Sequence, residues 1–362
     1  MTELLAWGIL GTATIARKCV IPAIHASSSN TVQVIGSRDP ASAGSLARKH
    51  DIQSVVEGYD AVLKDPHVEA VYIPLPNHLH REWAINAFEA GKHVLCEKPL
   101  AVNALEAAEM IAAAQDAGKM LMEGFMYRFH PRSRRIFQMT AEGRIGVLKL
   151  VRAAFCYRMD ETLRRSGKNF RLRPETGGGA LLDVGCYGVS TARWFFGKEP
   201  ISVQAQAEYH PNGVDVHLVG TLKFEGGGLA VVEASFISAL QQTFTLVGSG
   251  AVVELPHDAY IPWEKDAVYS IRNVDQETGE TITVPGDDEY RLMVEHFADV
   301  VQGRSQLDHP PEDSLANMRI LDALAEAAIS GRTVYIEELN RPCQTSMSHQ
   351  GQERYPRFLI SE

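Results

Sequence analysis

The first 125 residues alternate between short apolar runs and helical patterns, and this alternation limits the folds open to the chain. Apolar runs predict strands at residues 4–9, 31–36, 68–73, 93–96 and 120–123. Helical patterns lie between them, at residues 14–25, after Pro40, and at 78–90 and 104–117. Strands that alternate with helices form parallel sheets covered on both faces, so this half of the chain predicts a doubly wound α/β fold.

A turn of small residues follows the first strand directly: Gly11-Thr12-Ala13-Thr14-Ile15-Ala16. It stands where a G-x-G-x-x-G turn would, with alanine in the second and third small positions. Gly11 permits the tight turn, Ala13 must let a pyrophosphate approach the backbone, and Ala16 lets the helix pack closely on the strand. Small residues are common at such turns, but a strand before and a helix after favour a dinucleotide site, with residues 11–15 as cofactor contacts.

The second strand ends in Ser37, Arg38, Asp39 and Pro40. Sheets that bind NAD usually offer an acidic residue here to the ribose hydroxyls. Here a hydroxyl and a guanidinium come first, and both can hold a 2′-phosphate, which favours NADP and leaves NAD as the weaker alternative. We expect Asp39 to cap the next helix, with Pro40 at the first helical position.

The strand at 68–73 ends in Pro74-Leu75-Pro76-Asn77-His78-Leu79-His80. Two prolines stop the strand, and Asn77 is expected to cap the helix of residues 78–90. The first turn of that helix would then lie beside the phosphates or the ribose of the cofactor. Leu75, Pro76 and Asn77 are therefore candidate cofactor contacts. His80 is as typical of a helix surface as of a cofactor contact.

The strand at 93–96 stops abruptly at Glu97, Lys98 and Pro99. Asn103 follows as a candidate N-cap, with Glu106 completing a capping box. Glu97 and Lys98 thus stand at the carboxyl edge of the predicted sheet, where open α/β sheets bind ligands. A lysine there suits proton transfer or the polarisation of a hydroxyl. Taken alone, the Glu97–Lys98 pair is more typical of a surface ion pair in a loop.

After residue 130 the pattern changes. A basic amphipathic helix at 132–141 leads into a strand at 147–155, and residues 200–285 mostly alternate as strands with turn signals between them. Helices return at 289–302 and 313–330. We expect a Rossmann domain over 1–128, an α+β domain over 129–340 built on a largely antiparallel open sheet, and a polar C-terminal tail over 341–362. One face of this sheet would pack on helices and the other would be free to pair with another subunit.

A second chemical cluster follows the glycine run at 177–179. Asp183 and Tyr187 are four residues apart in an apolar helical pattern, so they share one helix face. A tyrosine hydroxyl beside a lysine ammonium can accept a proton from an alcohol, and a carboxylate can orient substrate hydroxyls. The alternative is structural, with Asp183 as an acid in the first helical turn and Tyr187 as a packing residue.

The composition excludes several classes of partner. A net charge of −10 disfavours nucleic acids and anionic membranes. No apolar run is long enough for a bilayer span, and the N-terminus enters a strand without a basic leader. The five cysteines are odd in number and widely spaced, which predicts buried thiols in a reducing cytoplasm and neither disulfides nor a metal site.

Six segments together resemble the glucose–fructose oxidoreductase/inositol dehydrogenase family. They resemble most closely the branch of NADP-dependent aldose dehydrogenases and dimeric dihydrodiol dehydrogenases. The segments occur in family order between residues 5 and 190, and they are residues 11–16, 37–39, 76–80, 97–100, 123–128 and 178–187. Each is common alone, but six in register are highly specific.

The resemblance implies a role for individual residues. Lys98 would hydrogen-bond the reacting hydroxyl and the nicotinamide ribose, in a segment whose proline is cis. Glu97 and Arg128 would lie at the nicotinamide end, Asp183 would hold substrate, and Tyr187 would take the proton. The inositol dehydrogenase branch has histidine where this chain has Tyr187, which argues against inositol as the substrate. We also expect Arg171 and Tyr290 to face the substrate.

The expected activity is hydride transfer between NADP(H) and a hydroxyl or carbonyl of a sugar or cyclic polyol, with C1 of an aldose preferred. The alternatives are reduction of a ketosugar or nucleotide-ketosugar, and oxidation of a trans-dihydrodiol. From another class, the chain could be a non-catalytic NADP-binding protein. A homodimer or homotetramer formed through the open sheet is expected.

Overall fold

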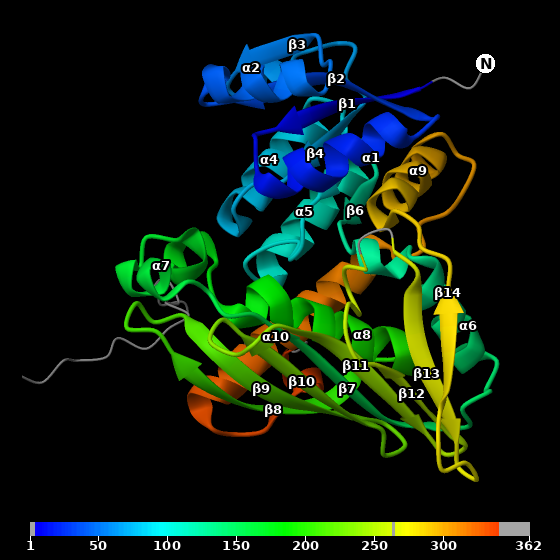
Figure 1. Ribbon diagram of the computed structural model, residues 1–362. Coiled ribbons are helices and arrows are strands. Elements are labelled where there is room, and N and C mark those ends of the chain that lie inside the picture. The colour runs from blue at the N-terminus through cyan, green and yellow to red at the C-terminus, as the bar shows by residue number, and fades with distance from the viewer. Residues whose placement is uncertain (1–3, 263–264, 340–362) are drawn as a thin grey trace, which may run out of the picture. The chain divides into compact units, whose positions relative to one another are not determined.

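The computed structural model describes residues 4–262 and 265–339, and the chain divides into two units (Figure 1). The first unit contains the chain up to His130 together with Asp287–Leu315, and the second contains Pro131–Gly286 and the chain from Ala316 onward. The tail expected at 341–362, with Cys343, lies outside the described residues. No helix in the described part of the chain has the length and apolar character that a membrane span requires.

The first unit is built on a parallel sheet of six strands in the order β3-β2-β1-β4-β5-β6. This is the order of a dinucleotide-binding sheet, with the direction of winding reversed between β1 and β4. The strands are β1 (Leu5–Leu10), β2 (Asn30–Ser37), β3 (Ser54–Glu57), β4 (Ala70–Ile73), β5 (His93–Cys96) and β6 (Leu121–Glu123). Both faces are covered, so β4 is buried at every residue.

Helical segments connect these strands. They are the π-helical segment η1 (Ala16–Val20), α1 (Ile21–Ala26), α2 (Pro40–Lys49), α3 (Asp60–Leu63), the 3₁₀ turn η2 (Asn77–Leu79), α4 (His80–Glu89), α5 (Ala104–Ala117) and the 3₁₀ turn η3 (Met126–Arg128). The predicted cap of α5 is confirmed, because Oδ1 of Asn103 accepts a hydrogen bond from the Glu106 N–H at 2.8 Å.

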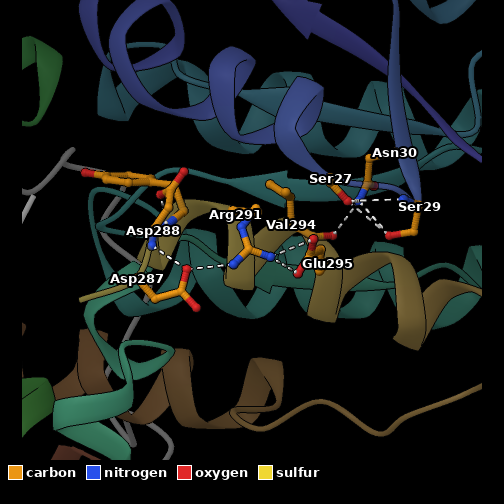
Figure 2. A network of polar contacts seen from close by, with 9 residues as sticks. Ser27, Ser29, Asn30, Asp287, Asp288, Arg291, Val294 and Glu295 are labelled. Atoms are coloured by element: carbon orange, nitrogen blue, oxygen red, sulfur yellow. Dashed lines mark hydrogen bonds and ion pairs between the residues drawn. The ribbon is translucent and has the colours of Figure 1, made fainter. Parts of the chain in front are cut away.

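Helix α9 (Glu289–Val301) belongs to the first unit, although the sequence division at residue 128 assigned it to the second domain. Its Phe297 ring lies 5.2 Å from the buried ring of Trp7. Figure 2 shows Asn30 reaching the backbone of α9, where its Nδ2 donates to the carbonyl of Val294 at 3.4 Å. Apolar and polar contacts to β1 and β2 thus hold a segment that sequence order alone could not assign.

The second unit is built on a nine-stranded sheet in the order β14-β13-β12-β11-β7-β10-β9-β8-β15. Only β7 and β10 pair in parallel among its adjacent described strands, which confirms the largely antiparallel sheet. The strands are β7 (Leu148–Cys156), β8 (Pro200–Tyr209), β9 (Asp215–Phe224), β10 (Leu229–Ser235), β11 (Gln241–Gly248), β12 (Ala251–Leu255), β13 (Ala267–Asn273), β14 (Glu280–Val284) and β15 (Val334–Tyr335).

One face of this sheet packs on helices. The boundary between the two units falls inside α10 (Pro311–Ser330). The other helical segments of the second unit are α6 (Pro131–Ala141), α7 (Glu161–Ser166), the 3₁₀ turns η4 (Phe170–Leu172) and η5 (Pro174–Thr176), the π-helical segment η6 (Leu181–Gly185), α8 (Cys186–Phe196) and α11 (Ile336–Leu339). Along β9, Leu218 and Leu222 are buried while Val219 is 41% exposed. This alternation is that of a sheet with one covered face.

Candidate active site

The turn after β1 has the backbone geometry that its sequence predicts. Gly11 adopts a φ of +104°, a conformation that favours glycine, and its N–H donates to the Gly36 carbonyl at 2.8 Å. A Cβ at this position would come within 3.4 Å of the Leu75 side chain. Ala16 is fully buried beneath the turn. The backbone at the carboxyl end of the central strand therefore fits the pyrophosphate of a dinucleotide, with Thr12, Ala13, Thr14 and Ile15 along the turn.

At the end of β2, Asp39 caps the next helix and Arg38 is exposed. Oδ1 of Asp39 accepts hydrogen bonds from the N–H groups of Ala41 and Ser42, at 3.1 and 3.3 Å, which confirms its predicted role as the cap of α2. Ser37 accepts from the Asp39 N–H at 3.0 Å and can still donate its own proton. The exposed Arg38 guanidinium makes no hydrogen bond or ion pair within the part of the chain that the structure describes. This arrangement fits an anionic group on a ribose.

The loop after β4 differs from the prediction in how the helix begins. Asn77 is the first residue of η2, and α4 starts only at His80, with Leu79 as its N-cap and no side-chain capping bond there. Asn77 contributes its backbone carbonyl, which accepts from the His80 N–H. The prediction that Asn77 caps a helix of residues 78–90 is therefore wrong. The two prolines impose extended backbone, so the chain first enters a short 3₁₀ turn.

His80 connects two loops at the carboxyl edge of the sheet. Its ring is fully buried, with Nε2 2.8 Å from the Leu75 carbonyl oxygen and Nδ1 3.0 Å from that of Pro99. Burial lowers the pKa of His80 to about 4. The neutral ring donates to one of these two carbonyls and lies against the other, so it packs between the loop after β4 and the loop after β5. The expected position of His80 on the helix surface is wrong, because its ring is fully buried, and its expected contact with the cofactor remains a prediction.

Glu97 follows β5 and lies against the buried hydroxyl of Tyr72. The Tyr72 hydroxyl donates to Oε1 of Glu97 at 2.6 Å, and the Lys98 N–H donates to Oε2 at 3.3 Å. Burial and the neighbouring Glu97 carboxylate raise the pKa of Tyr72 well above its ordinary value, so the phenol remains a donor. These contacts hold Glu97 in place directly before Lys98.

Lys98 lies in a loop whose backbone is held on both sides. The Lys98–Pro99 peptide is cis, as the resemblance implies, and Lys98 itself is half-buried. Two residues further on, the Leu100 N–H donates to Oε1 of the buried Glu123 at 2.8 Å. Burial raises the pKa of Glu123 to about 7. Together with His80, these contacts fix the lysine at the carboxyl end of β5, the place where parallel sheets bind ligands.

Arg128 and Tyr290 have partners within the first unit. Nη1 of the buried Arg128 lies 2.8 Å from Oδ2 of Asp313 in an ion pair. Tyr290 stands at the start of α9, is 5% exposed, and lies near the buried Cys19 thiol. Burial raises the pKa of both members of this second pair, that of Cys19 to about 11. Both pairs therefore connect segments that are distant in sequence, and the expected ligand contacts of Arg128 and Tyr290 remain predictions.

In the second unit, Asp183 is the acceptor of a small polar cluster. Its Oδ2 accepts from Nε of Arg171 at 2.9 Å and from the Tyr157 hydroxyl at 3.1 Å. Burial and the nearby Asp183 raise the pKa of Tyr157, while Asp183 raises the pKa of Arg171. The carboxylate is thus held between a phenol and a guanidinium. Such a group can orient the hydroxyls of a polar ligand.

The glycine run explains how Arg171 reaches Asp183. The N–H groups of Gly178 and Gly179 donate to the carbonyls of Arg173 and Arg171, at 3.0 and 2.9 Å. A Cβ on Gly178 would lie 2.6 Å from the Arg171 carbonyl oxygen, so only glycine fits. The Asp183 N–H in turn donates to the Gly179 carbonyl. Close backbone packing therefore brings the guanidinium to the carboxylate.

Tyr187 lies in α8 and is 4% exposed. Its ring packs against those of Phe155 and Tyr260, with centroids 5.2 and 5.0 Å apart. Phe155 and Tyr157 are two residues apart on β7 and just beyond it, so they project from one sheet face. Asp183 contacts Tyr157, and Tyr187 contacts Phe155. The predicted common face of the two candidates is therefore the face directed at β7.

Sequence reasoning missed Tyr157. It directly follows β7, at the end of an apolar run, which is a position with the same signal as Glu97 after β5. It also missed that Asp183 lies in a π-helical segment, a distortion of regular helix that often accompanies functional sites.

Two family models match the chain. One describes an oxidoreductase family with an NAD-binding Rossmann fold and matches residues 5–125, and the other describes a GFO/IDH/MocA C-terminal domain and matches residues 133–254. A D-xylose 1-dehydrogenase (NADP+) of Haloferax volcanii is 36% identical over 335 residues, which are 92% of this chain and 100% of that protein.

Two further relatives differ in the reactions that their names give. A trans-1,2-dihydrobenzene-1,2-diol dehydrogenase of Xenopus tropicalis is 32% identical over 262 residues, covering 71% of this chain and 76% of that protein. A 3-ketoreductase from Actinomadura kijaniata, solved with NADP and TDP-benzene, superposes with a TM-score of 0.83 at 30% identity, covering 90% of this chain and 98% of that one.

Proposed function

Because the chain belongs to the GFO/IDH/MocA family of oxidoreductases, we propose that it transfers a hydride between NADP(H) and a sugar or cyclic polyol, at C1 of an aldose. The observation that carries the proposal is the position of Lys98 at the carboxyl end of β5. His80 and Glu123 hold the two residues that follow it, Pro99 and Leu100. The D-xylose 1-dehydrogenase relative, matched over its whole length, supports the choice of an aldose.

Asp183, Tyr187 and Lys98 each have a separate role in the proposed reaction. The nicotinamide ring supplies or accepts the hydride. Asp183 orients the substrate hydroxyls through the carboxylate that Arg171 and Tyr157 hold in place. In the oxidative direction the Tyr187 side chain, ionised to its phenolate, takes the proton of the reacting hydroxyl, and the Lys98 ammonium stabilises the charge that develops on that oxygen. Glu97 and Arg128 complete the nicotinamide end.

The cofactor assignment rests on the end of β2. Arg38 is exposed, and the Asp39 carboxylate is engaged as the cap of α2. A cation is therefore available at the end of β2, where the ribose of a bound dinucleotide lies in this fold. A 2′-phosphate would be attracted here. The NADP in the names of two relatives supports the same choice, with NAD as a weaker alternative.

A second reaction keeps the same residues and changes the substrate. The 3-ketoreductase from Actinomadura kijaniata supports reduction of a nucleotide-linked ketosugar, and the Xenopus tropicalis relative supports oxidation of a trans-dihydrodiol. Asp183 with Arg171 favours a polar, hydroxyl-rich ligand over an aromatic diol. We therefore place sugars first.

A substrate panel followed at the nicotinamide absorbance tests the proposal. Aldoses with NADP+, ketosugars with NADPH and trans-dihydrodiols with NADP+ form its three arms. Turnover of aldoses above the other arms is expected. Turnover confined to another arm would reassign the substrate, and tight NADPH binding with no turnover in any arm would make the chain a binding protein.

We propose the exposed face of the large sheet as the contact between identical subunits. Val219 and Leu229 are 41% and 48% exposed on adjacent strands, beside polar side chains of the same face. Sedimentation of wild-type protein and of a Val219→Lys variant tests this contact. We expect a dimer or tetramer that dissociates in the variant, and equal sedimentation would contradict it.

A further inference from the structure

A pocket of about 350 Å³ lies beside the Asp183 cluster within the second unit. Its walls come from the segment after β7, from α7 and from the segment after β10. Apolar side chains form one part of its lining, namely Met159, Phe236 and Ile237, and charged side chains form the other, namely Arg158, Glu161 and Arg164. An apolar wall beside charged side chains is typical of a ligand site.

The charge of this pocket is positive. Neither the Arg158 nor the Arg164 guanidinium makes a hydrogen bond or ion pair with another residue among 4–262 and 265–339. The lining holds one carboxylate, Glu161, against these two guanidinium groups, and that carboxylate is ion-paired with Arg165. Residues 158–173 carry six basic side chains and two acidic ones, in a chain whose net charge is −10. Cations gathered here, against the balance of the chain, indicate an anionic ligand.

The pocket adjoins the candidate substrate carboxylate through two rings. Phe236 in the pocket wall lies 5.2 Å from the ring of Tyr157, measured between centroids. The Tyr157 hydroxyl donates to Asp183, and Arg158 is the next residue along the chain. A ligand held by Asp183 could therefore extend a substituent into the pocket.

We propose that this pocket binds a phosphate group of the substrate, so that the preferred aldose carries a phosphate ester on a carbon other than C1. The inference rests on the proposed function for the part of the ligand that reacts. Guanidinium groups bind phosphate oxygens in pairs of parallel hydrogen bonds, and two of them match a phosphate or diphosphate better than a neutral hydroxyl.

A binding experiment tests the site without catalysis. The protein is saturated with NADP+, so that the phosphate sites of the cofactor are occupied, and is then titrated with inorganic pyrophosphate in a calorimeter. Arg158→Gln and Arg164→Gln should each weaken pyrophosphate binding about tenfold or more, because each removes a charge-assisted contact. Lys168→Gln is the matched control, since it removes an exposed charge of the same segment outside the pocket lining. Its binding should stay within about twofold of wild type.

Equal affinities in all four proteins, or no saturable pyrophosphate binding by wild type, would overturn the proposal. Kinetics then identify the source of the phosphate. Each neutral aldose is compared with its form phosphorylated away from C1, and Arg158→Gln should lower kcat/KM only for the phosphorylated form. Turnover confined to a dTDP-linked sugar, whose C1 is esterified, would place the reaction at another carbon and contradict the assignment of C1. Efficient turnover of neutral sugars alone, unaffected by Arg158→Gln, would refute the phosphate site and leave the proposed oxidoreductase intact. Absence of all turnover, with pyrophosphate binding that depends on both arginines, would refute the oxidoreductase and leave the site.

Discussion

Nε of Arg171 lies 2.9 Å from Oδ2 of Asp183, although twelve residues separate the two in sequence. The pair is partly shielded, with 34% and 15% of the two side chains exposed. An ion pair at this exposure contributes little to folding, so the geometry points to a role in ligand binding. The guanidinium and Tyr157 together hold the carboxylate in one orientation.

Replacing Asp183 by Asn should therefore lower kcat/KM for the preferred sugar by about 10- to 100-fold, because contacts to charged groups contribute roughly 1.5–3 kcal/mol. The affinity for NADPH should stay unchanged, since these side chains lie outside the Rossmann unit. Initial rates and fluorescence titration of NADPH measure the two effects.

The control for that substitution is Glu175→Gln, which also turns a carboxylate into an amide but at an exposed position paired with Arg173. We expect wild-type rates from it. Equal losses in the two variants would mean that general charge, and not the held carboxylate, determines the rate.

Simultaneous replacement of Ser37 and Arg38 by Ala should discriminate between the two nicotinamide cofactors. The dissociation constant of NADPH should rise about 30-fold or more through the loss of contacts to the 2′-phosphate, while that of NADH should change less than threefold. Titration of both cofactors into both proteins measures this. Equal weakening of NADPH and NADH would exclude the 2′-phosphate assignment.

His80 should make stability dependent on pH. Its pKa is about 4 in the folded protein and 6.5 in an unfolded chain, so between these values the unfolded state binds more protons. The free energy of unfolding is therefore at its full value above pH 6.5 and falls as the pH drops to 4, by about 3 kcal/mol for this residue. Urea unfolding at a series of pH values measures the slope.

The matched measurement uses a His80→Gln variant, whose amide can still donate to a carbonyl. Its free energy of unfolding should fall less steeply over the same range. Two other buried groups also make the free energy of unfolding depend on pH: His309, with a pKa of about 4, in the same direction as His80, and Glu123, with a pKa of about 7, in the opposite direction. Both are present in the wild type and in the variant, so their effects cancel when the two curves are subtracted. Parallel curves would show that His80 is not the group responsible.

Much of the fold was predictable because local patterns determine the local elements. The runs at 31–36 and 93–96 became β2 and β5, and Asp39 and Asn103 cap the helices as expected. The order of the nine strands and the packing of α9 were not predictable in this way. Both depend on partners such as Trp7 and Phe297, which nothing in the local pattern connects.

In the candidate site, too, some features follow from the local sequence and others depend on distant partners. Residues at strand ends, such as Lys98, can be found from the sequence because strand ends share one edge of a sheet. The contact of Arg171 with Asp183 depends on the carbonyls that Gly178 and Gly179 engage, and the position of His80 depends on a carbonyl nineteen residues away. Such contacts follow from loop paths, which periodicity does not describe.

We propose that Lys98 and Tyr187 act on the same hydroxyl in one chemical step. Single-turnover hydride transfer in Lys98→Met, Tyr187→Phe and the double variant tests it most directly. Each single substitution should slow the step by about 10²- to 10⁴-fold, with NADPH affinity retained. If the two groups act as a unit, the double variant should be only a few-fold slower than the slower single variant. Losses that multiply, or near-normal hydride transfer in Lys98→Met, would contradict the account.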